Sequence, residues 1–155
     1  MNPRELERLF KSINKFDDHM GLELAITNDG QTSYRLTIHE ALMSSPAAIH
    51  GGAISAMMDA TLGIQALCHA AKSNMLCSTV EFKINFLSQA TIGETLIGQA
   101  KLDYTGKRLV VSSADIIEEK SKRIVAKGLG TFNLYPMKKR EDVEAAASPE
   151  NASWS

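Results

Sequence analysis

The chain has few cysteines and no surplus of positive charge. Its 155 residues include only two cysteines, Cys68 and Cys77. These are too few for a disulfide framework or a zinc ribbon, so we expect free, buried thiols. Acidic and basic residues nearly cancel and give a formal charge of −1 at pH 7. We therefore expect no nucleic-acid partner.

The signatures of several hydrolase classes are also missing. The sequence has no Gly-x-Ser-x-Gly elbow of a serine hydrolase and no His-Glu-x-x-His or Cys-x-x-Cys pairing for a metal. A nucleophilic Cys68 would need a facing histidine, and its neighbour His69 points elsewhere on a helix. The chain opens with MNPRELERLFKSINKF, which is an amphipathic helical pattern and not a basic leader with an apolar core. We therefore expect a cytoplasmic protein with no bound metal.

The hydrophobic pattern predicts a single α+β domain. With 44% hydrophobic residues, the chain is long enough for one real core. After the N-terminal helix, alternating apolar residues on both sides of Asn28-Asp29-Gly30 predict a β-hairpin. The remaining expected elements are a long helix that starts at Gly51-Gly52 and ends near residues 72–74, and strands over 76–86, 96–104, 109–117 and 124–134, with Gly128 and Gly130 as candidates for a bulge. We assign the domain to residues 1–136 and a flexible tail to 137–155.

The most informative segment is His50-Gly51-Gly52 with the apolar stretch that follows it. Two glycines at a helix start leave backbone N–H groups open to a ligand, and the first N–H groups of a helix lack internal partners, so this site suits an oxyanion. The stretch over 53–71 is apolar on every side and predicts a buried helix. Asp59 and Gln65 within it argue against a membrane span. A carboxylate inside such a helix is costly unless it is paired, hydrated or used, so Asp59 requires an explanation.

Helix geometry limits how these groups can cooperate. If the Gly51 N–H polarises a carbonyl and Asp59 acts on the same carbonyl, both must lie within about 3 Å of the reacting atoms. Eight residues of straight helix separate them by about 12 Å along the axis. One chain therefore cannot close the site. A two-fold dimer with antiparallel central helices could bring Asp59 of one chain to Gly51 of the other.

Three segments carry a resemblance to a known family: IHGGAISAMMDATLG, STVEFKINFLSQATIGETL and GLGTF. Over about residues 20 to 135 the chain resembles the hotdog-fold acyl-CoA thioesterases of the phenylacetate-degradation (PaaI-like) type. The specific features are an apolar residue before HGG, a helical carboxylate nine positions after the histidine, and a long strand ending NFLSxAxxGExL. The resemblance implies an antiparallel sheet wrapped around a long central helix, assembled as a homodimer or as a homotetramer that is a dimer of dimers.

The resemblance also implies hydrolysis of an aryl or medium- to long-chain acyl-CoA to the free acid and CoA. The Gly51 backbone N–H would be the oxyanion donor, and Asp59 of the partner subunit the general base or the nucleophile. Thr79 stands where the family often has Ser or Thr near the carboxylate, from the partner strand, and would orient Asp59 or the water. Coenzyme A enters as part of the substrate, and no separate cofactor or metal is implied. A thiolate leaves readily, so a carboxylate and an oxyanion hole can suffice.

One position departs from the family pattern. Many members carry Asn or Gln six residues before the HGG histidine, where the side chain positions the water or the thioester. This chain has Ser44 there or, with a one-residue slip, Ser45-Pro46. A serine hydroxyl is shorter and lacks the paired donor and acceptor of an amide. We expect either weak activity or an unusual substrate.

For the remaining candidates a structural role stands beside the functional one. His50 more readily fixes the turn before the helix than takes part in catalysis. Gly52 either packs the helix start or offers a second amide to the substrate. Met58, with its neighbour Met57, either lines an acyl tunnel or fills the core. The clusters Lys107-Arg108 and Lys138-Lys139-Arg140 either bind the phosphates of CoA or form solvated faces.

Two functions from different classes are open at this point. The leading one is an acyl-CoA thioesterase in which Asp59 carries the chemistry. The alternative is a non-catalytic acyl-CoA-binding hotdog module, which Ser44 favours and in which Asp59 would hold a cross-dimer hydrogen bond without chemistry. Thr79 would then be an ordinary strand residue.

Overall fold

The computed structural model describes residues 1–137 of the chain. Two helices, α1 (Pro3–Ile13) and α2 (Lys15–Met20), precede β1 (Leu22–Ile26) and β2 (Thr32–Thr37). A 3-10 turn, η1 (Glu40–Leu42), and the short strands β3 (Met43–Ser45) and β4 (Ala48–Ile49) lead to the long helix α3 (Gly51–Ala71). Four long strands follow: β5 (Met75–Phe86), β6 (Thr95–Thr105), β7 (Leu109–Glu118) and β8 (Ile124–Pro136).

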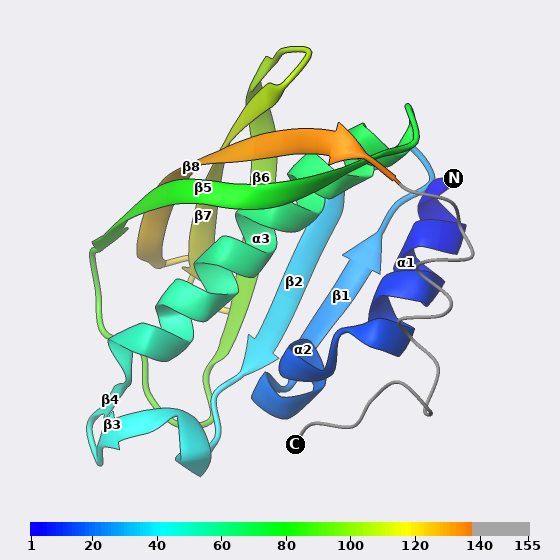
Figure 1. Cartoon of the computed structure of the whole chain (residues 1–155). Coiled ribbons are helices and arrows are strands. Elements are labelled where there is room, and N and C mark those ends of the chain that lie inside the picture. The colour runs from blue at the N-terminus through cyan, green and yellow to red at the C-terminus, as the bar shows by residue number, and fades with distance from the viewer. Residues whose placement is uncertain (138–155) are drawn as a thin grey trace, which may run out of the picture.

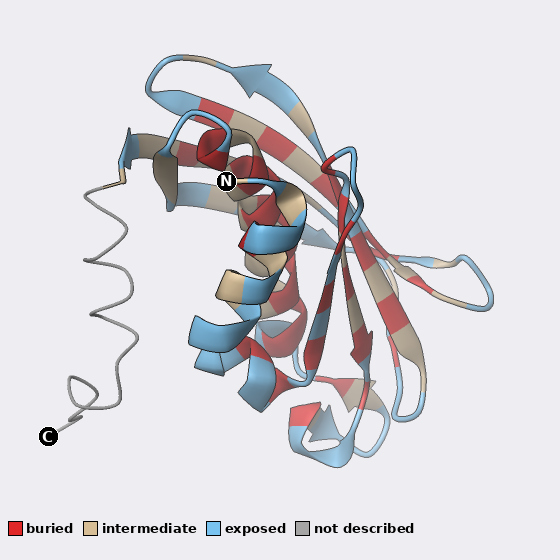
Figure 2. Ribbon diagram, turned by 90° about the vertical axis from the view of Figure 1, so that its right-hand side faces the viewer, coloured by how far each residue is buried: buried red, intermediate tan, exposed pale blue. Residues whose placement is uncertain are grey.

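Six of the strands form one antiparallel sheet that curves around α3 (Figure 1). Their order is β1-β2-β6-β7-β8-β5, which leaves β1 and β5 at the edges. The residues coloured as buried in Figure 2 lie on α3 and on the strands packed against it. The largest of them that are fully buried include Tyr34, Phe132, Leu36, Ile38, Met57, Met58 and Leu62. The predicted antiparallel sheet wrapped around a central helix is confirmed.

Glycines in the sheet allow α3 to lie close to the strands. A Cβ atom at Gly128 would lie 2.4 Å from Met58 Sδ, and one at Gly98 would lie 2.4 Å from Thr61 Oγ1. Both contacts are too short for a side chain, so these positions require glycine. The prediction that Gly128 marks a bulge with Gly130 is wrong. Strands β5 and β8 stay in register across both glycines, which serve helix packing instead.

The N-terminal segment differs from the single helix that the sequence predicts. The helix is interrupted at Asn14, whose N–H donates to Phe10 O at the end of α1. The Asn14 side chain then accepts from the Asp17 N–H and caps α2. An Asn in this pattern ends one helix and starts the next because its short side chain replaces a backbone partner.

One face of α3 is left uncovered within a single chain. The residues on this stripe are half-buried: Ser55, Ala56, Asp59, Ala60, Gly63 and Leu67. The sequence predicts a helix that is buried on every side. In the structure, α3 is buried only on the sides that face the sheet. Within residues 1–137 no helix is both long and apolar enough to cross a membrane. The expected tail over 137–155 lies, apart from Met137, outside the described residues, and the domain boundary stays a prediction.

Candidate active site

The start of α3 is built by His50 and two glycines. His50 Nδ1 accepts a hydrogen bond from the Gly52 N–H at 2.8 Å and so caps the helix. A Cβ atom at residue 52 would lie 2.8 Å from the same ring nitrogen, which explains the glycine there by packing. The His50 carbonyl accepts from Ala53 and Ile54. The Gly52 N–H and the imidazole are therefore engaged with each other, and a catalytic His50 or a substrate-binding Gly52 stays a prediction.

The backbone N–H of Gly51 is the free group at this helix start. Within residues 1–137 no atom accepts a hydrogen bond from it. Gly51 borders a hollow of about 340 Å³, here called the helix-start hollow, which is lined by Ala48, Ile49, Gly51, Ile54, Phe86, Leu87, Ser88, Gln89 and Ala90. A free N–H at the positive end of a 21-residue helix is a good donor to a negatively charged oxygen.

Asp59 lies two turns along the helix, on its uncovered stripe. Thr79 Oγ1 donates a hydrogen bond of 2.9 Å to Asp59 Oδ1. Thr79 belongs to β5 of the same chain, so one subunit supplies both groups. A single hydrogen bond fixes the rotation of the carboxylate and leaves acceptor capacity for a water molecule. Thr79 is thus in the place that an orienting residue needs.

Asp59 and Thr79 border a second hollow of about 490 Å³, here called the carboxylate hollow. Its walls come from three places in the chain: the α1–α2 region, the open stripe of α3, and strands β5 and β8. Four of the five phenylalanines line it: Phe10, Phe16, Phe82 and Phe132. A mostly apolar hollow with Asp59 and Asp17 as the carboxylates on its wall is suited to an uncharged organic group held beside a reactive acid or base.

Cys77 also borders the carboxylate hollow, close to Asp59. Burial and, to a smaller extent, the negative charge of Asp59 together raise the pKa of the Cys77 thiol to about 12. The pKa of Cys68 is likewise raised by burial. Both cysteines are free thiols, as predicted. Because the thiolate is the reactive form, neither is suited to act as a nucleophile near neutral pH.

Among the residues that the structure describes, the two hollows share no lining residue. Gly51 and Asp59 are eight residues apart on one straight helix, which corresponds to about 12 Å along the axis. The structure of one chain therefore does not bring the free N–H and the carboxylate together. Across residues 1–137 there is also no group of three or more His, Cys, Asp or Glu side chains placed to hold a metal ion.

Comparison with known proteins places this geometry in a family. Residues 47–125 match the family model of the thioesterase superfamily, and this region contains the HGG turn, α3, Thr79 and the NFLSQATIGETL segment. The chain belongs to the thioesterase superfamily. It is a hydrolase of thioesters with the hotdog fold, so the predicted fold and enzyme class are confirmed. No curated protein matches the chain.

Solved structures similar to this thioesterase share its fold. The E. coli PaaI protein from the phenylacetic acid degradation operon superposes with a TM-score of 0.78 at 16% identity, over 86% of this chain and 93% of its own. A conserved protein from Pseudomonas aeruginosa is 27% identical, with a TM-score of 0.71 over 81% of this chain and 98% of its own. A hypothetical thioesterase with coenzyme A from Streptococcus pneumoniae has a TM-score of 0.70 at 16% identity, over 86% and 99%. At 16% identity the likeness to PaaI shows the fold, and the PaaI-like subgroup stays a prediction.

Three further predicted site residues lie away from both hollows of the thioesterase. The Ser44 hydroxyl donates to the Ala48 carbonyl at 3.2 Å across the β3–β4 hairpin. Met58 is fully buried against Gly128, so core packing accounts for it. Arg108 is exposed in the β6–β7 turn, where its carbonyl accepts from Leu134. The described chain gives none of the three a contact with a ligand site, and the basic cluster at 138–140 lies outside the described residues.

Sequence reasoning missed the contribution of the N-terminal helices to the carboxylate hollow. Asn14 and Asp17 line it together with Phe10 and Phe16. Asp17 is almost fully buried and accepts a hydrogen bond from the Tyr34 hydroxyl, which ties α2 to β2. Burial raises the pKa of the Asp17 carboxyl, while the hydrogen bond from Tyr34 opposes that rise. No motif in the first 20 residues signals this contribution, because a sequence alone does not say which hollow a helix covers.

Proposed function

We propose that this thioesterase hydrolyses acyl-CoA, with each active site shared between two subunits. The observation that carries the proposal is the division of the site on α3. A free oxyanion donor borders one hollow, and a carboxylate oriented by Thr79 borders the other. Two antiparallel copies of α3 would bring Gly51 of one subunit to Asp59 of the other, because the same eight-residue spacing runs in opposite directions.

The surface next to Asp59 supports a dimer of this kind. Strand β5 is an edge of the sheet, and Val80 and Phe86 on it are 59% and 52% exposed. The neighbouring stripe of α3 carries small residues such as Ser55, Ala56 and Ala60. A long edge strand with exposed apolar side chains is prone to pair with another chain, and small residues allow two helices to approach closely. A homodimer is therefore the smallest active unit in this proposal, and a homotetramer is a pair of such dimers.

The proposed reaction uses only groups of the chain and a water molecule. The thioester carbonyl oxygen accepts from the Gly51 N–H, so the negative charge that develops during attack meets the positive end of α3. Asp59, held by Thr79, takes a proton from the attacking water, and the tetrahedral intermediate then expels the CoA thiolate. The thiolate takes up the proton and leaves as the thiol. Direct attack by Asp59, followed by hydrolysis of the anhydride, is the other route that a carboxylate in this place allows.

The carboxylate hollow is the proposed site of the acyl group. Its phenylalanine-rich wall matches an aryl or a medium- to long-chain acyl group, which would gain from burial of apolar surface. Coenzyme A is the proposed carrier of that group. The hypothetical thioesterase from Streptococcus pneumoniae contains coenzyme A, and a Streptococcus mutans protein with a TM-score of 0.65 is bound to acetyl CoA.

The test is thiol release from acetyl-CoA, benzoyl-CoA and palmitoyl-CoA by the wild type and by Asp59→Asn. The variant keeps a side-chain oxygen to accept from Thr79, so it should fold normally, while kcat falls by about 100-fold or more. Asp115→Asn, which changes an exposed carboxylate paired with Lys127, is the matched control and should keep wild-type turnover. Wild-type turnover by Asp59→Asn would refute the assigned role. Binding of these thioesters without any thiol release by the wild type would favour the non-catalytic module.

A further inference from the structure

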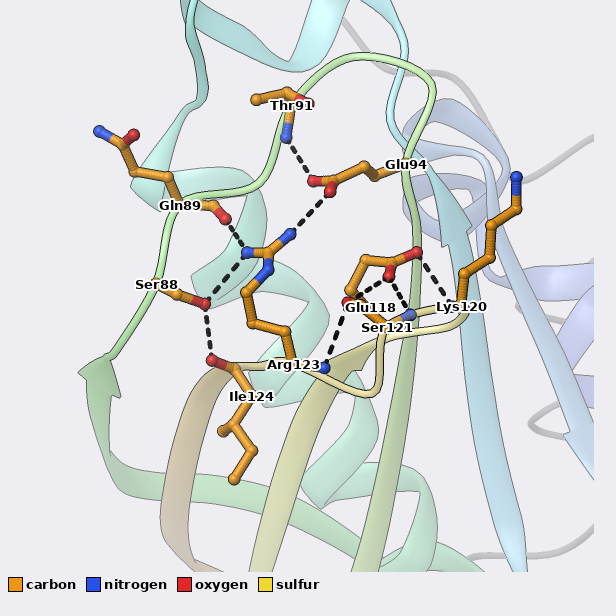
Figure 3. A network of polar contacts seen from close by, with 9 residues as sticks. All are labelled: Ser88, Gln89, Thr91, Glu94, Glu118, Lys120, Ser121, Arg123 and Ile124. Atoms are coloured by element: carbon orange, nitrogen blue, oxygen red, sulfur yellow. Dashed lines mark hydrogen bonds and ion pairs between the residues drawn. The ribbon is translucent and has the colours of Figure 1, made fainter.

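Arg123 lies at the centre of a polar network that joins two loops of the sheet (Figure 3). Its Nη2 donates to Glu94 Oε1 at 2.7 Å, and its Nη1 donates to Ser88 Oγ at 3.1 Å and also to the Gln89 carbonyl. The Ser88 hydroxyl in turn donates to the Ile124 carbonyl at 2.6 Å. One guanidinium therefore holds both ends of the loop that runs from β5 to β6.

The loop held by Arg123 is a wall of the helix-start hollow. Its residues 87 to 90 all line that hollow, opposite Gly51 and Ile54. The loop is also joined to the start of α3, because the Ile49 N–H donates to the Ala90 carbonyl at 3.0 Å and Ala90 is fully buried. A shift of the loop would therefore also move Ile49 and His50, the two residues that precede the Gly51 N–H.

A rigid turn presents Arg123 to this loop. The Glu118 carboxylate accepts from the Ser121 N–H and hydroxyl at 2.6 Å each, and from the Lys120 N–H at 3.1 Å. These hydrogen bonds lower the pKa of Glu118 to about 2 because they stabilise the ionised carboxylate, and they tie the turn before Arg123 together. Figure 3 shows Glu118 beside the backbone from which Arg123 extends toward Glu94.

We propose that Arg123, together with Glu94, is a positioning residue for thioester hydrolysis, acting through residues 87 to 90 on the geometry beside the Gly51 N–H. The inference rests on the proposed role of Gly51. This positioning role gives a structural reason for several residues of the segment NFLSQATIGE. Ser88 and Glu94 bind the guanidinium, Ala90 joins the loop to Ile49, and Gly93 adopts a φ of 84° in the turn between them.

The test compares Arg123→Ala with Arg35→Ala. Arg35, on β2, pairs at 2.9 Å with Glu119, which lies on the same turn as Arg123. The two arginine side chains have similar exposure, but among residues 1–137 Arg35 makes no hydrogen bond to the loop. Using the fastest of acetyl-CoA, benzoyl-CoA and palmitoyl-CoA, we expect Arg123→Ala to lower kcat by about tenfold to a hundredfold, with KM changed by less than about threefold. Arg35→Ala should leave both constants unchanged. Adding Glu94→Gln to Arg123→Ala should cause little further loss, because the glutamine keeps an oxygen for the Thr91 N–H, which donates to Glu94 at 2.8 Å, and the ion pair with Arg123 is already lost.

Hydrogen exchange at the Ile49 amide separates this inference from the proposed function. Exchange there should be faster in Arg123→Ala than in the wild type and unchanged in Arg35→Ala. Equal losses of kcat in both arginine variants, or faster exchange with unchanged kcat, would overturn the positioning role. A wild type that releases no thiol would refute the proposed function, whereas the exchange measurement would still show whether Arg123 fixes the loop.

Discussion

Replacing Gly51 with proline tests the oxyanion donor while leaving the helix start intact. Proline lacks the backbone N–H and is well tolerated at the first position of a helix. The residue before a proline must be extended, and His50 already has φ −67° and ψ 133°. The Gly51 N–H has no acceptor within residues 1–137, so its removal costs no hydrogen bond there.

Gly51→Ala is the matched control for this change. A Cβ atom at residue 51 would lie 3.7 Å from Phe86 Cζ, which is ordinary van der Waals contact. The alanine variant therefore adds the side-chain bulk but keeps the N–H. Loss of one oxyanion donor reduces kcat by about 10² to 10³, or about 3 to 4 kcal/mol of transition-state stabilisation. We expect this loss in Gly51→Pro and not in Gly51→Ala, with both variants melting within a few degrees of the wild type.

Mixing Gly51→Pro with Asp59→Asn tests whether the two groups act across subunits. In a shared site, a mixed dimer contains one active site with both an intact Gly51 and an intact Asp59. Random exchange makes about half of the dimers mixed, and each has one working site of two, so about one quarter of wild-type activity returns. If the mixture is no more active than its parts, or if Gly51→Pro matches Gly51→Ala, the reasoning about the shared site is refuted.

Two further predictions concern stability. Gly128→Ala forces a Cβ against the fully buried Met58 and should destabilise the protein by about 2 kcal/mol, lowering Tm by roughly 4 to 8 °C. In thermal melts the control Lys127→Ala, at an exposed neighbouring position, should change Tm little. Equal Tm values for the two variants would contradict the packing argument. Glu118 has its pKa lowered in the folded protein to about 2, so it stabilises the fold above the unfolded pKa of 4.5 and loses that contribution as pH falls toward 2. The Tm difference between the wild type and Glu118→Gln should therefore shrink as pH falls through this window, and a constant difference would show that the charge is not responsible.

The parts of the structure that follow from local sequence could be predicted from the chain alone. Asn28-Asp29-Gly30 gave the hairpin because a turn residue with positive φ is required, and Gly30 has φ 89°. The helix after HGG followed from its apolar length and its glycine start. The pairing of Asp59 with Thr79, by contrast, spans 20 residues and depends on where β5 crosses α3. Only the family resemblance pointed to it.

Other features were hidden because they depend on packing between distant segments. The glycines of β8 look like bulge signals in sequence, and only the position of α3 shows that they make room for Met58. Arg123 looks like one charge among many. Its function as a link between two loops depends on residues about 30 positions away, such as Glu94. Met58 and Ser44 were assigned to the site by sequence position, which carries no information on whether a side chain faces a hollow.

In the proposed dimer, the spacing on α3 would also explain why Ser55 on its open stripe is small. If Gly51 of one subunit is to meet Asp59 of the other across a two-fold axis, the axis must pass near the residue halfway between them, which is Ser55. Two copies of this residue then face each other, so a large side chain there would hold the helices apart. Ser55 is small, half-buried, and turned back on its own helix by a 2.9 Å hydrogen bond to the Gly51 carbonyl. In the proposed dimer the same residue would allow close approach at the axis, while its hydrogen bond to the Gly51 carbonyl stabilises the first turn of α3.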